Sequence, residues 1–309
     1  MDEFELIRTW FSRPCSGADV RQGGGDDAAV LAPSPGHDLV MTMDTLVSGR
    51  HFPEDLPAFD IGWRSLVVNL SDLAAMGADP AWCLLSLSLP KLDQHWLKGF
   101  ADGFYAAADE FRIRLVGGDT VRGPLSITVQ ASGQLPAGTA LLRSGARPGD
   151  RICIGGVPGE AAAGLHAWQA GQRDGAAVNA FRQPQPQLAL GRKLRRVASA
   201  CIDVSDGLLA DLSHILDASG GLGAELELAC LPVSAAFAGH EAAQRQAWQL
   251  TGGDDYLLLF TMPASVILPQ GCVSLGRVTP RPGLRLLDEQ GKLVDCPVTG
   301  FNHFPPGAD

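Results

Sequence analysis

Acidic residues recur on glycine-bearing turns and beside predicted strands of this 309-residue chain. The turns are Gly25-Asp26-Asp27, Gly118-Asp119 and Gly253-Asp254-Asp255, and the acids beside strands are Asp44, Asp203 and Asp206. Glycine lets a backbone approach a ligand closely. One such turn is ordinary, because Gly-Asp is common turn chemistry and aspartate is a common helix cap. The repetition is what indicates a site.

A cluster of these carboxylates would need cations among them. Two carboxylates 4 Å apart repel by roughly 4 kcal/mol at an effective dielectric constant near 20. Oxygen ligands without histidine or cysteine favour magnesium, with calcium or manganese next. Magnesium shares its ligand shell with substrate phosphates. The acids therefore predict bound Mg²⁺ ions, and this chemistry suits a nucleotide as the ligand.

The familiar phosphate-binding and calcium-binding motifs are missing from the sequence. It contains no Gly-x-x-x-x-Gly-Lys-Ser/Thr loop, no His-Arg-Asp loop, no Gly-x-Gly-x-x-Gly after a strand, and no EF-hand pattern. The formal net charge is -10, so cations must supply the positive charge that a nucleotide requires. If ATP binds here, we expect it to bind through metals.

Composition limits the class of protein. With 46% hydrophobic and 19% charged residues, the chain can form two ordinary domains with apolar cores. The net charge of -10 argues against a nucleic-acid partner. No apolar run approaches the roughly 18 residues of a membrane span, and the acidic start is unlike a secretory signal. Seven singly spaced cysteines fit reduced thiols better than disulfides. Together these features predict a cytoplasmic protein without a membrane partner.

The first part of the chain predicts a mixed α+β domain. Helices are expected over 3–12, 60–77 and 94–111, and strands over 28–31, 39–43, 84–89, 113–116 and 125–134. Asp60 is the expected N-cap of the second helix and Gly77 the glycine after its end. Ser65, Asn69 and Asp72 share one face of that helix. The fourth strand is expected to stop at Gly117.

A Gly-, Pro- and Arg-containing stretch over 137–150 lacks periodicity and predicts a domain boundary. After it we expect an α/β unit with strands over 151–154, 201–204 and 256–260. A helix is expected from Glu160, and another after 201–204 with Ser205 or Asp206 as its cap. The predicted domains are therefore 1–137 and 138–309.

Three strings of residues resemble thiamine-monophosphate kinases. The longest is Val68-Asn69-Leu70-Ser71-Asp72-Leu73-Ala74-Ala75-Met76-Gly77-Ala78-Asp79-Pro80, and Gly117-Gly118-Asp119-Thr120 and Ile202-Asp203-Val204-Ser205-Asp206-Gly207 follow in order. The resemblance runs the whole length of the chain. That family belongs to the ATP-binding superfamily that includes aminoimidazole ribonucleotide synthetase.

The resemblance implies the organisation of the molecule. Residues 1–137 would form a mixed-sheet domain that binds ATP and magnesium and pairs with a second copy through its sheet, giving a homodimer. Residues 138–309 would form an α/β sandwich domain that completes the metal and substrate site.

The resemblance also implies a role for particular residues. Those implied to hold magnesium are Asp27, Thr42, Met43, Asp44, Asp72 and Asp119, with Asp203 and Asp206 from the second domain. Those implied to contact ATP are Tyr105, Gly118, Asp119, Arg143 and Ser205. The phosphorylated acceptor, thiamine monophosphate, would contact His51, Asp254 and Phe301.

The mechanism expected from this resemblance is direct in-line transfer of a phosphoryl group. An acceptor phosphate oxygen is already anionic, so no general base is assigned. One alternative is a superfamily synthetase that forms an acyl phosphate or iminophosphate and releases inorganic phosphate. Another is a non-catalytic, metal-stabilised binding protein. Formation of ADP that depends on the acceptor separates these three interpretations.

Overall fold

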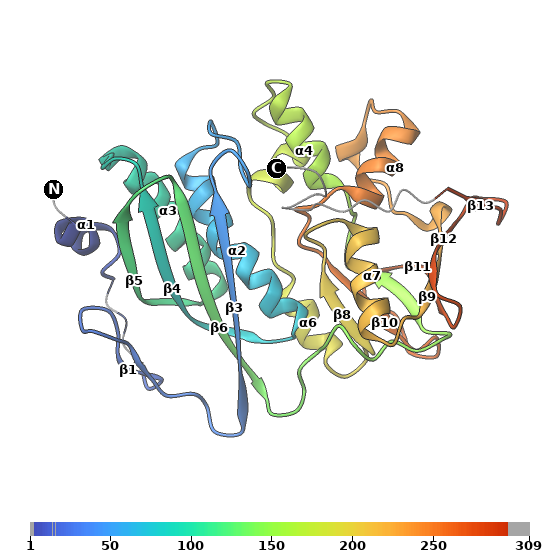
Figure 1. The fold of residues 1–309 in the computed structure, drawn as a ribbon, viewed down its shortest axis with the longest axis horizontal. Helices are drawn as coiled ribbons and strands as arrows, with labels where there is room; N and C mark the ends of the chain where they lie inside the picture. Colours follow the sequence, from blue (N-terminus) through green and yellow to red (C-terminus); the bar gives the residue numbers. More distant parts are fainter. Residues whose placement is uncertain (1–2, 14, 16, 296–309) are drawn as a thin grey trace. The chain divides into compact units, whose positions relative to one another are not determined.

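The computed structural model describes residues 3–13, 15 and 17–295. The chain divides into two compact units, one of Met1–Leu73 with Ala78–Ala140 and one of Ala74–Gly77 with Leu141–Asp309. Each unit combines helices with sheets (Figure 1), so the mixed two-domain fold class is confirmed.

The described residues of the first unit form three helices and two sheets. Its helices are α1 (Glu3–Trp10), α2 (Ala58–Ala75) and α3 (Gln94–Phe111). Its strands are β1 (Val20–Gln22), β2 (Val30–Leu31), β3 (His37–Val47), β4 (Asp79–Leu89), β5 (Arg114–Arg122) and β6 (Ser126–Pro136). β1 and β2 form an antiparallel pair, and the other four strands form a sheet in the order β3-β6-β4-β5. Only β4 and β5 run parallel in that sheet.

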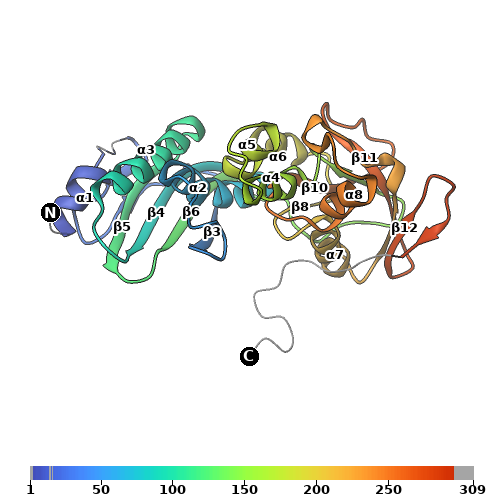
Figure 2. The same ribbon diagram turned by 90° about the horizontal axis from the view of Figure 1, so that it is seen from above.

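The helices α2 and α3 cover one face of the four-stranded sheet (Figure 2). Side chains of a strand alternate between two faces, and Ile127 and Val129 on β6 are fully buried, as is Leu87 on β4. This face therefore forms the core of the unit.

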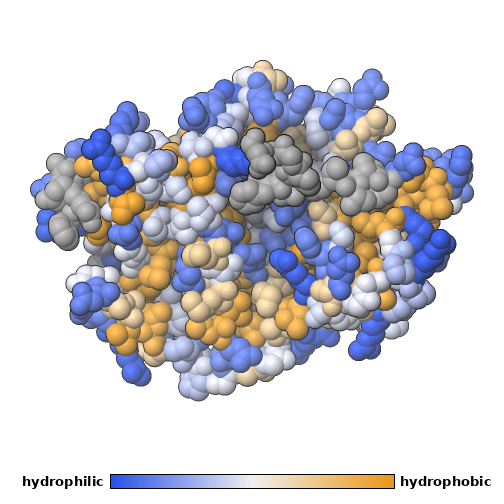
Figure 3. Space-filling model, in the orientation of Figure 1, coloured by the Kyte–Doolittle hydropathy of each residue, from blue (hydrophilic) through white to orange (hydrophobic). Residues whose placement is uncertain are grey.

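The opposite face of the same sheet carries exposed apolar side chains. Met41 and Met43 on β3 are 61% and 66% exposed, and Leu39, Leu84 and Val121 are also exposed. Hydrophobic residues gather over this region of the surface (Figure 3). Contiguous exposed apolar patches are uncommon on monomeric proteins and are a feature of interaction surfaces.

The ends of α2 differ in part from expectation. The prediction that Asp60 caps the helix is wrong, because α2 begins at Ala58 and Asp60 lies in its first turn. A carboxylate is still favourable there, near the positive end of the helix dipole. Gly77 does follow the helix as predicted: its φ is 72°, and the Gly77 and Ala78 N–H groups donate to carbonyls of the last turn.

Two strands are longer than the sequence indicates. β3 runs from His37 to Val47, so Asp44 lies inside a strand rather than at its end. β5 does not stop at Gly117 but continues to Arg122. The reason is pairing: the ladder between β4 and β5 continues through Gly117, Gly118 and Asp119, so these residues are strand rather than turn.

The second unit is built on a seven-stranded sheet in the order β13-β12-β9-β11-β7-β10-β8. Its strands are β7 (Arg151–Ile154), β8 (Ala200–Asp203), β9 (Gly223–Glu227), β10 (Leu258–Met262), β11 (Val273–Thr279), β12 (Gly283–Leu287) and β13 (Leu293–Val294). Its helices are α4 (Glu160–Gln169), α5 (Ala176–Arg182), α6 (Leu188–Leu194), α7 (Leu208–Ala218) and α8 (Ala242–Thr251), with short 3₁₀ turns at Leu228–Cys230 and Ala235–Phe237.

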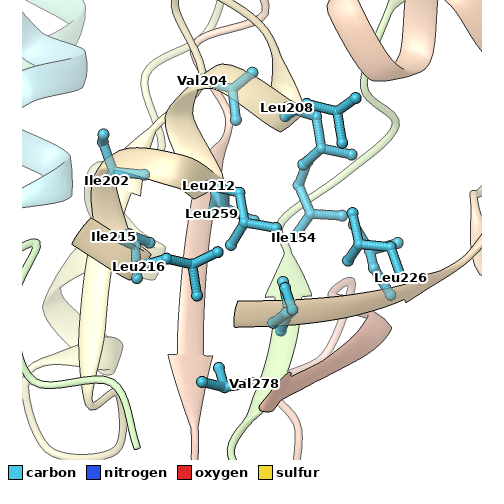
Figure 4. Close-up of a cluster of buried hydrophobic side chains, with 14 of the residues drawn as sticks. Ile154, Ile202, Val204, Leu208, Leu212, Ile215, Leu216, Leu226, Leu259 and Val278 are labelled. Carbon is cyan, nitrogen blue, oxygen red and sulfur yellow. The ribbon is translucent and has the colours of Figure 1, made fainter. Parts of the chain in front are cut away.

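The core of this unit lies between α7 and the sheet. Leu212 and Ile215 of α7 join Ile154, Ile202 and Leu259 of three strands in one buried cluster (Figure 4). Side chains three and four residues apart share a helix face, so α7 presents a continuous apolar stripe to the strands. The loop between β8 and α7 therefore starts and ends on well-packed elements.

No helix among the described residues is both long enough and apolar enough to cross a membrane. The six cysteines of the described chain are free thiols, in line with their unpaired spacing in the sequence.

Candidate functional site

Three of the residues implied to hold magnesium lie together in the first unit. Alternation along β3 places Thr42 and Asp44 on the less exposed side of the strand. The Thr42 Oγ1 donates to Asp72 Oδ2 of α2 at 2.5 Å, and the Asp44 N–H donates to Asn69 Oδ1 of α2 at 3.1 Å. The polar face predicted for α2 therefore meets β3 at this point.

The electrostatics of this cluster favour a bound cation. Burial, followed by the charge of the nearby Asp72 carboxyl and a hydrogen bond with it, raises the pKa of Asp44 to about 7. A divalent cation relieves such repulsion directly. The donors that Thr42, Asp44 and Asp72 offer are all hard oxygen atoms, so the residues present fit Mg²⁺.

For the other implied ligands of the first unit, the structure gives no hydrogen bond to Thr42, Asp44 or Asp72 among the described contacts. Asp27 lies on the exposed turn between β1 and β2, where its N–H donates to Asp26 Oδ1 at 2.9 Å. Asp119 is exposed on β5. The Met43 side chain projects from the face of β3 opposite Asp44, which leaves its backbone carbonyl as the group able to bind. Within the described residues, no three His, Cys, Asp or Glu side chains form a ready metal-binding group.

Three residues implied to contact ATP lie in the first unit: Tyr105, Gly118 and Asp119. Tyr105 of α3 is only 6% exposed, and the Arg13 guanidinium carbon lies 3.7 Å from the centre of its ring. Burial raises the pKa of the Tyr105 phenol to about 12, so it stays protonated at neutral pH. Gly118 is an exposed residue of β5, next to Asp119.

His51 lies in the turn that follows β3. Its Nδ1 accepts the Val47 N–H at 2.9 Å, which assigns the ring proton of the neutral imidazole to Nε2. The turn therefore fixes the orientation of the ring through Nδ1.

In the second unit, Asp203 ends β8 and is 5% exposed, while Ser205 and Asp206 lie half-buried in the loop that follows. The prediction that Ser205 or Asp206 caps the next helix is wrong, because Gly207 takes that position without a side-chain cap. Arg143 is exposed in the segment before β7.

Sequence reasoning missed Asp211, which holds the loop before α7. Its Oδ2 accepts the N–H groups of Ser205, Asp206 and Gly207 at 3.0, 3.1 and 3.1 Å. Burial raises the pKa of Asp211 to about 7. One signal was present in the sequence: an acid occupies the apolar stripe of the helix, between leucines that face the core.

Sequence reasoning placed Asp255 on an acidic turn but did not predict that it caps a helix. Its two oxygens accept the Gly159 and Ala161 N–H groups at 2.5 and 3.0 Å, so it caps α4 from a distant loop. Burial raises the pKa of Asp255 to about 7. Nothing local in the sequence pairs residue 255 with residue 159.

Asp254 has a left-handed backbone, with a φ of 66°, and its Oδ1 accepts the Tyr256 hydroxyl at 3.0 Å. A non-glycine residue in this conformation is uncommon and often marks a functional loop. Phe301, the third residue implied to contact the acceptor, lies outside the described residues.

The second unit also has a cavity of about 730 Å³ that involves none of these residues. Glu225, Arg277 and Arg285 are among its lining side chains. Arg277 donates twice to Glu225, at 2.7 and 3.0 Å, and Arg285 donates to the Thr279 hydroxyl and a backbone carbonyl. These contacts explain the arginines as part of the sheet surface.

Comparison with known proteins identifies the family. Residues 25–135 match the family described as AIR synthase related protein, N-terminal domain. The chain is 46% identical over 269 residues to the thiamine-monophosphate kinase of Salmonella typhimurium, covering 84% of this chain and 82% of that protein.

Solved structures agree with the sequence match. The crystal structure of thiamine-monophosphate kinase from Stenotrophomonas maltophilia K279a has a TM-score of 0.84 and 43% identity, over 94% of this chain and 98% of that chain. A structure described as AaThiL complexed with AMPPCP and TMP has a TM-score of 0.79 and 28% identity, over 88% of this chain and 89% of that chain. The resemblance found in the sequence, and the kinase class that it implied, are confirmed. The chain belongs to the thiamine-monophosphate kinase family.

Proposed function

We propose that this protein transfers the γ-phosphoryl group of ATP to the phosphate of thiamine monophosphate, giving thiamine diphosphate and ADP. The observation that carries the proposal is the pairing of Asp44 and Asp72 beside Thr42, in a chain 46% identical to a thiamine-monophosphate kinase. A relative described as complexed with AMPPCP and TMP supports both substrates.

Mg²⁺ bound at such a site would offset the negative charge of the ATP phosphates and of the transferring group. The residues proposed to hold it are Asp27, Thr42, Asp44, Asp72 and Asp119, the backbone of Met43, and Asp203 and Asp206. Their oxygen donors match the preference of magnesium. The closeness of the Asp72 carboxyl to Asp44 supports a cation between them, because a cation would offset the repulsion of the two charges.

The chain's own residues would position the two substrates. We assign Tyr105, Gly118, Asp119, Arg143 and Ser205 to ATP. A guanidinium such as that of Arg143 suits phosphate oxygens, since it can donate two parallel hydrogen bonds. His51, Asp254 and Phe301 are assigned to the acceptor, and the hydrogen bond from the Val47 N–H holds the His51 ring in a fixed orientation.

The reaction needs no base from the protein. An acceptor phosphate oxygen forms a bond to the γ-phosphorus while the bond from that phosphorus to the β,γ-bridging oxygen breaks, and ADP leaves with the electron pair. The attacking oxygen is anionic at neutral pH, so no proton has to be removed. The aspartates therefore hold charge in place and do not act as proton acceptors.

We further propose that the protein acts as a homodimer that pairs through the four-stranded sheet. The exposed apolar side chains Leu39, Met41, Met43 and Leu84 on the sheet face away from α2 and α3 support this surface.

A turnover assay with ATP, Mg²⁺ and thiamine monophosphate tests the activity. We expect one ADP for each thiamine diphosphate formed, and no ADP without the acceptor. Release of inorganic phosphate in place of thiamine diphosphate would favour a synthetase.

A further inference from the structure

The loop between β8 and α7 is fastened by one carboxylate oxygen. Three consecutive N–H groups, from Ser205, Asp206 and Gly207, all donate to Asp211 Oδ2 at 3.0–3.1 Å. Asp211 is only 2% exposed. Three hydrogen bonds from adjacent residues to a single oxygen leave the loop backbone little freedom.

These hydrogen bonds use the main chain of the loop and leave its side chains for other partners. Neither the Ser205 hydroxyl nor the Asp206 carboxylate takes part in them. Both side chains are half-buried and follow directly on Asp203 at the end of β8. Asp211 therefore fixes the backbone positions of Ser205 and Asp206 and makes none of these hydrogen bonds to the polar atoms of their side chains.

A second loop rests on the first. The Asp254 N–H donates to the Ser205 carbonyl at 2.9 Å, and the Tyr256 N–H donates to the Val204 carbonyl at 2.8 Å. Gly253 permits this approach, because a Cβ there would lie 2.3 Å from the Ser205 carbonyl oxygen. The position of Asp254 thus depends on the loop that Asp211 holds.

We infer that Asp211 is a positioning residue for the reaction, which sets the placement of Ser205 and Asp206 directly and of Asp254 through the Ser205 carbonyl. The inference rests on the proposed function for the roles of those three residues. Partners that orient metal-binding and substrate-binding groups typically change affinity or activity 10- to 100-fold when they are removed. Loss of the Asp211 acceptor would leave three loop N–H groups to find new partners, and the loop would relax.

The test uses the full chain with Asp211→Asn and Asp211→Ala. Asp217→Asn is the matched control, since Asp217 is an exposed acid on the same helix. Three quantities are compared: hydrogen exchange of the 205–207 amides, equilibrium affinity for Mn²⁺ in the presence of an ATP analogue, and the KM for thiamine monophosphate. The first two do not require turnover.

We expect Asp211→Ala to speed exchange of the 205–207 amides and to weaken Mn²⁺ affinity by about tenfold or more, with a rise in KM for the acceptor. Asp211→Asn keeps one neutral oxygen acceptor and should give smaller changes in the same direction. The control should match the wild-type protein in all three.

Wild-type exchange and wild-type Mn²⁺ affinity in a folded Asp211→Ala protein would overturn the inference. If the alanine variant does not fold, the asparagine variant decides by the same two measurements. Absence of kinase turnover in the wild-type protein would instead contradict the proposed function, and the exchange rates would still decide what Asp211 does to the loop.

Discussion

At the scale of single residues, Asp44 and Asp72 show how a site can be unfavourable for the protein without its ligand. Two carboxyl groups come together at the meeting of β3 and α2, and the pKa of Asp44 rises to about 7. Such an arrangement weakens the folded state once both groups are charged. A bound cation would replace the repulsion between the two carboxylates by attraction to the cation. The pair is therefore better explained by ligand binding than by a contribution to the stability of the fold.

Replacing Asp44 by Asn should therefore separate activity from stability. Turnover should fall by at least about a hundredfold, because a charged oxygen ligand is lost. The Tm of the ligand-free protein at pH 8 should stay the same or rise, because one of two repelling charges is removed. Asp119→Asn should show the same loss of turnover. Glu110→Gln, an exposed change on α3, is the control for both measurements; near-normal turnover of Asp44→Asn in saturating Mg²⁺ would contradict the assignment.

Asp255 should make stability depend on pH. Its pKa is raised to about 7 by burial, above the value of 3.8 for an exposed aspartate, so between these values the folded state binds a proton that the unfolded state has released. The free energy of unfolding should decline as pH rises from 4 to 7, by up to about 4 kcal/mol from this group. Denaturant unfolding of Asp255→Asn at several pH values should show a shallower decline than the wild-type protein. Parallel curves would rule out this role for Asp255.

The sequence could identify the acids but not all of their partners. Thr42, Asp44 and Asp72 were chosen by resemblance, and the structure brings these three together. Asp255 was missed because it accepts backbone N–H groups of a segment that is distant in sequence, and such a contact leaves no local motif. Asp211 accepts N–H groups of the loop just before its own helix, and its only sign in the sequence was an acid within the apolar stripe.

At the scale of elements, the bounds that sequence patterns predicted well are those set by local chemistry. Asp93 accepts the N–H groups of His95 and Trp96, and α3 occupies residues 94–111 as predicted. The predicted strand ended before β5 does, because Gly117 and Gly118 are typical of a turn. In the structure, pairing with β4 continues the strand through both glycines. Strand length depends on a partner that is distant in sequence, so the local pattern could not supply it.

The crossing of α2 and α3 depends on a small residue. A Cβ at Gly103 would lie 1.9 Å from the Phe59 carbonyl oxygen, so Gly103→Ala must push α2 and α3 apart. We expect a loss of about 1–3 kcal/mol in the free energy of unfolding, measured with denaturant. A Cβ at Gly99 on the same helix would meet the Ala58 methyl group at 3.2 Å and the Phe59 nitrogen at 3.7 Å, so Gly99→Ala should cost less. An equal effect of the two variants would show that the close approach does not matter.

At the scale of the whole molecule, the sequence resemblance gave the two-domain mixed fold and the family, because both depend on patterns spread over the chain. The relative placement of the aspartates from the two units is a property of tertiary structure, and it stays a prediction. The exposed face of the four-stranded sheet is the other feature at this scale, because we propose that a second copy of the chain binds there.

Charging that face should separate the proposed dimer. Met41→Glu with Met43→Glu places two carboxylates on the exposed side of β3 and should halve the mass measured by light scattering during size-exclusion chromatography. Ile267→Glu, at a residue of the second unit that is 91% exposed, should leave the mass unchanged. A wild-type protein of monomer mass would show that the face serves another purpose.

The central claim is that separate aspartates of this chain bind shared divalent cations around ATP. Crystals grown with Mn²⁺ and a non-hydrolysable ATP analogue test it most directly, because manganese scatters anomalously and reveals its own position. We predict anomalous peaks within bonding distance, about 2.2 Å, of the Asp44 and Asp72 carboxylates and of the nucleotide phosphates. Bound nucleotide with no anomalous peak beside those carboxylates would contradict the account.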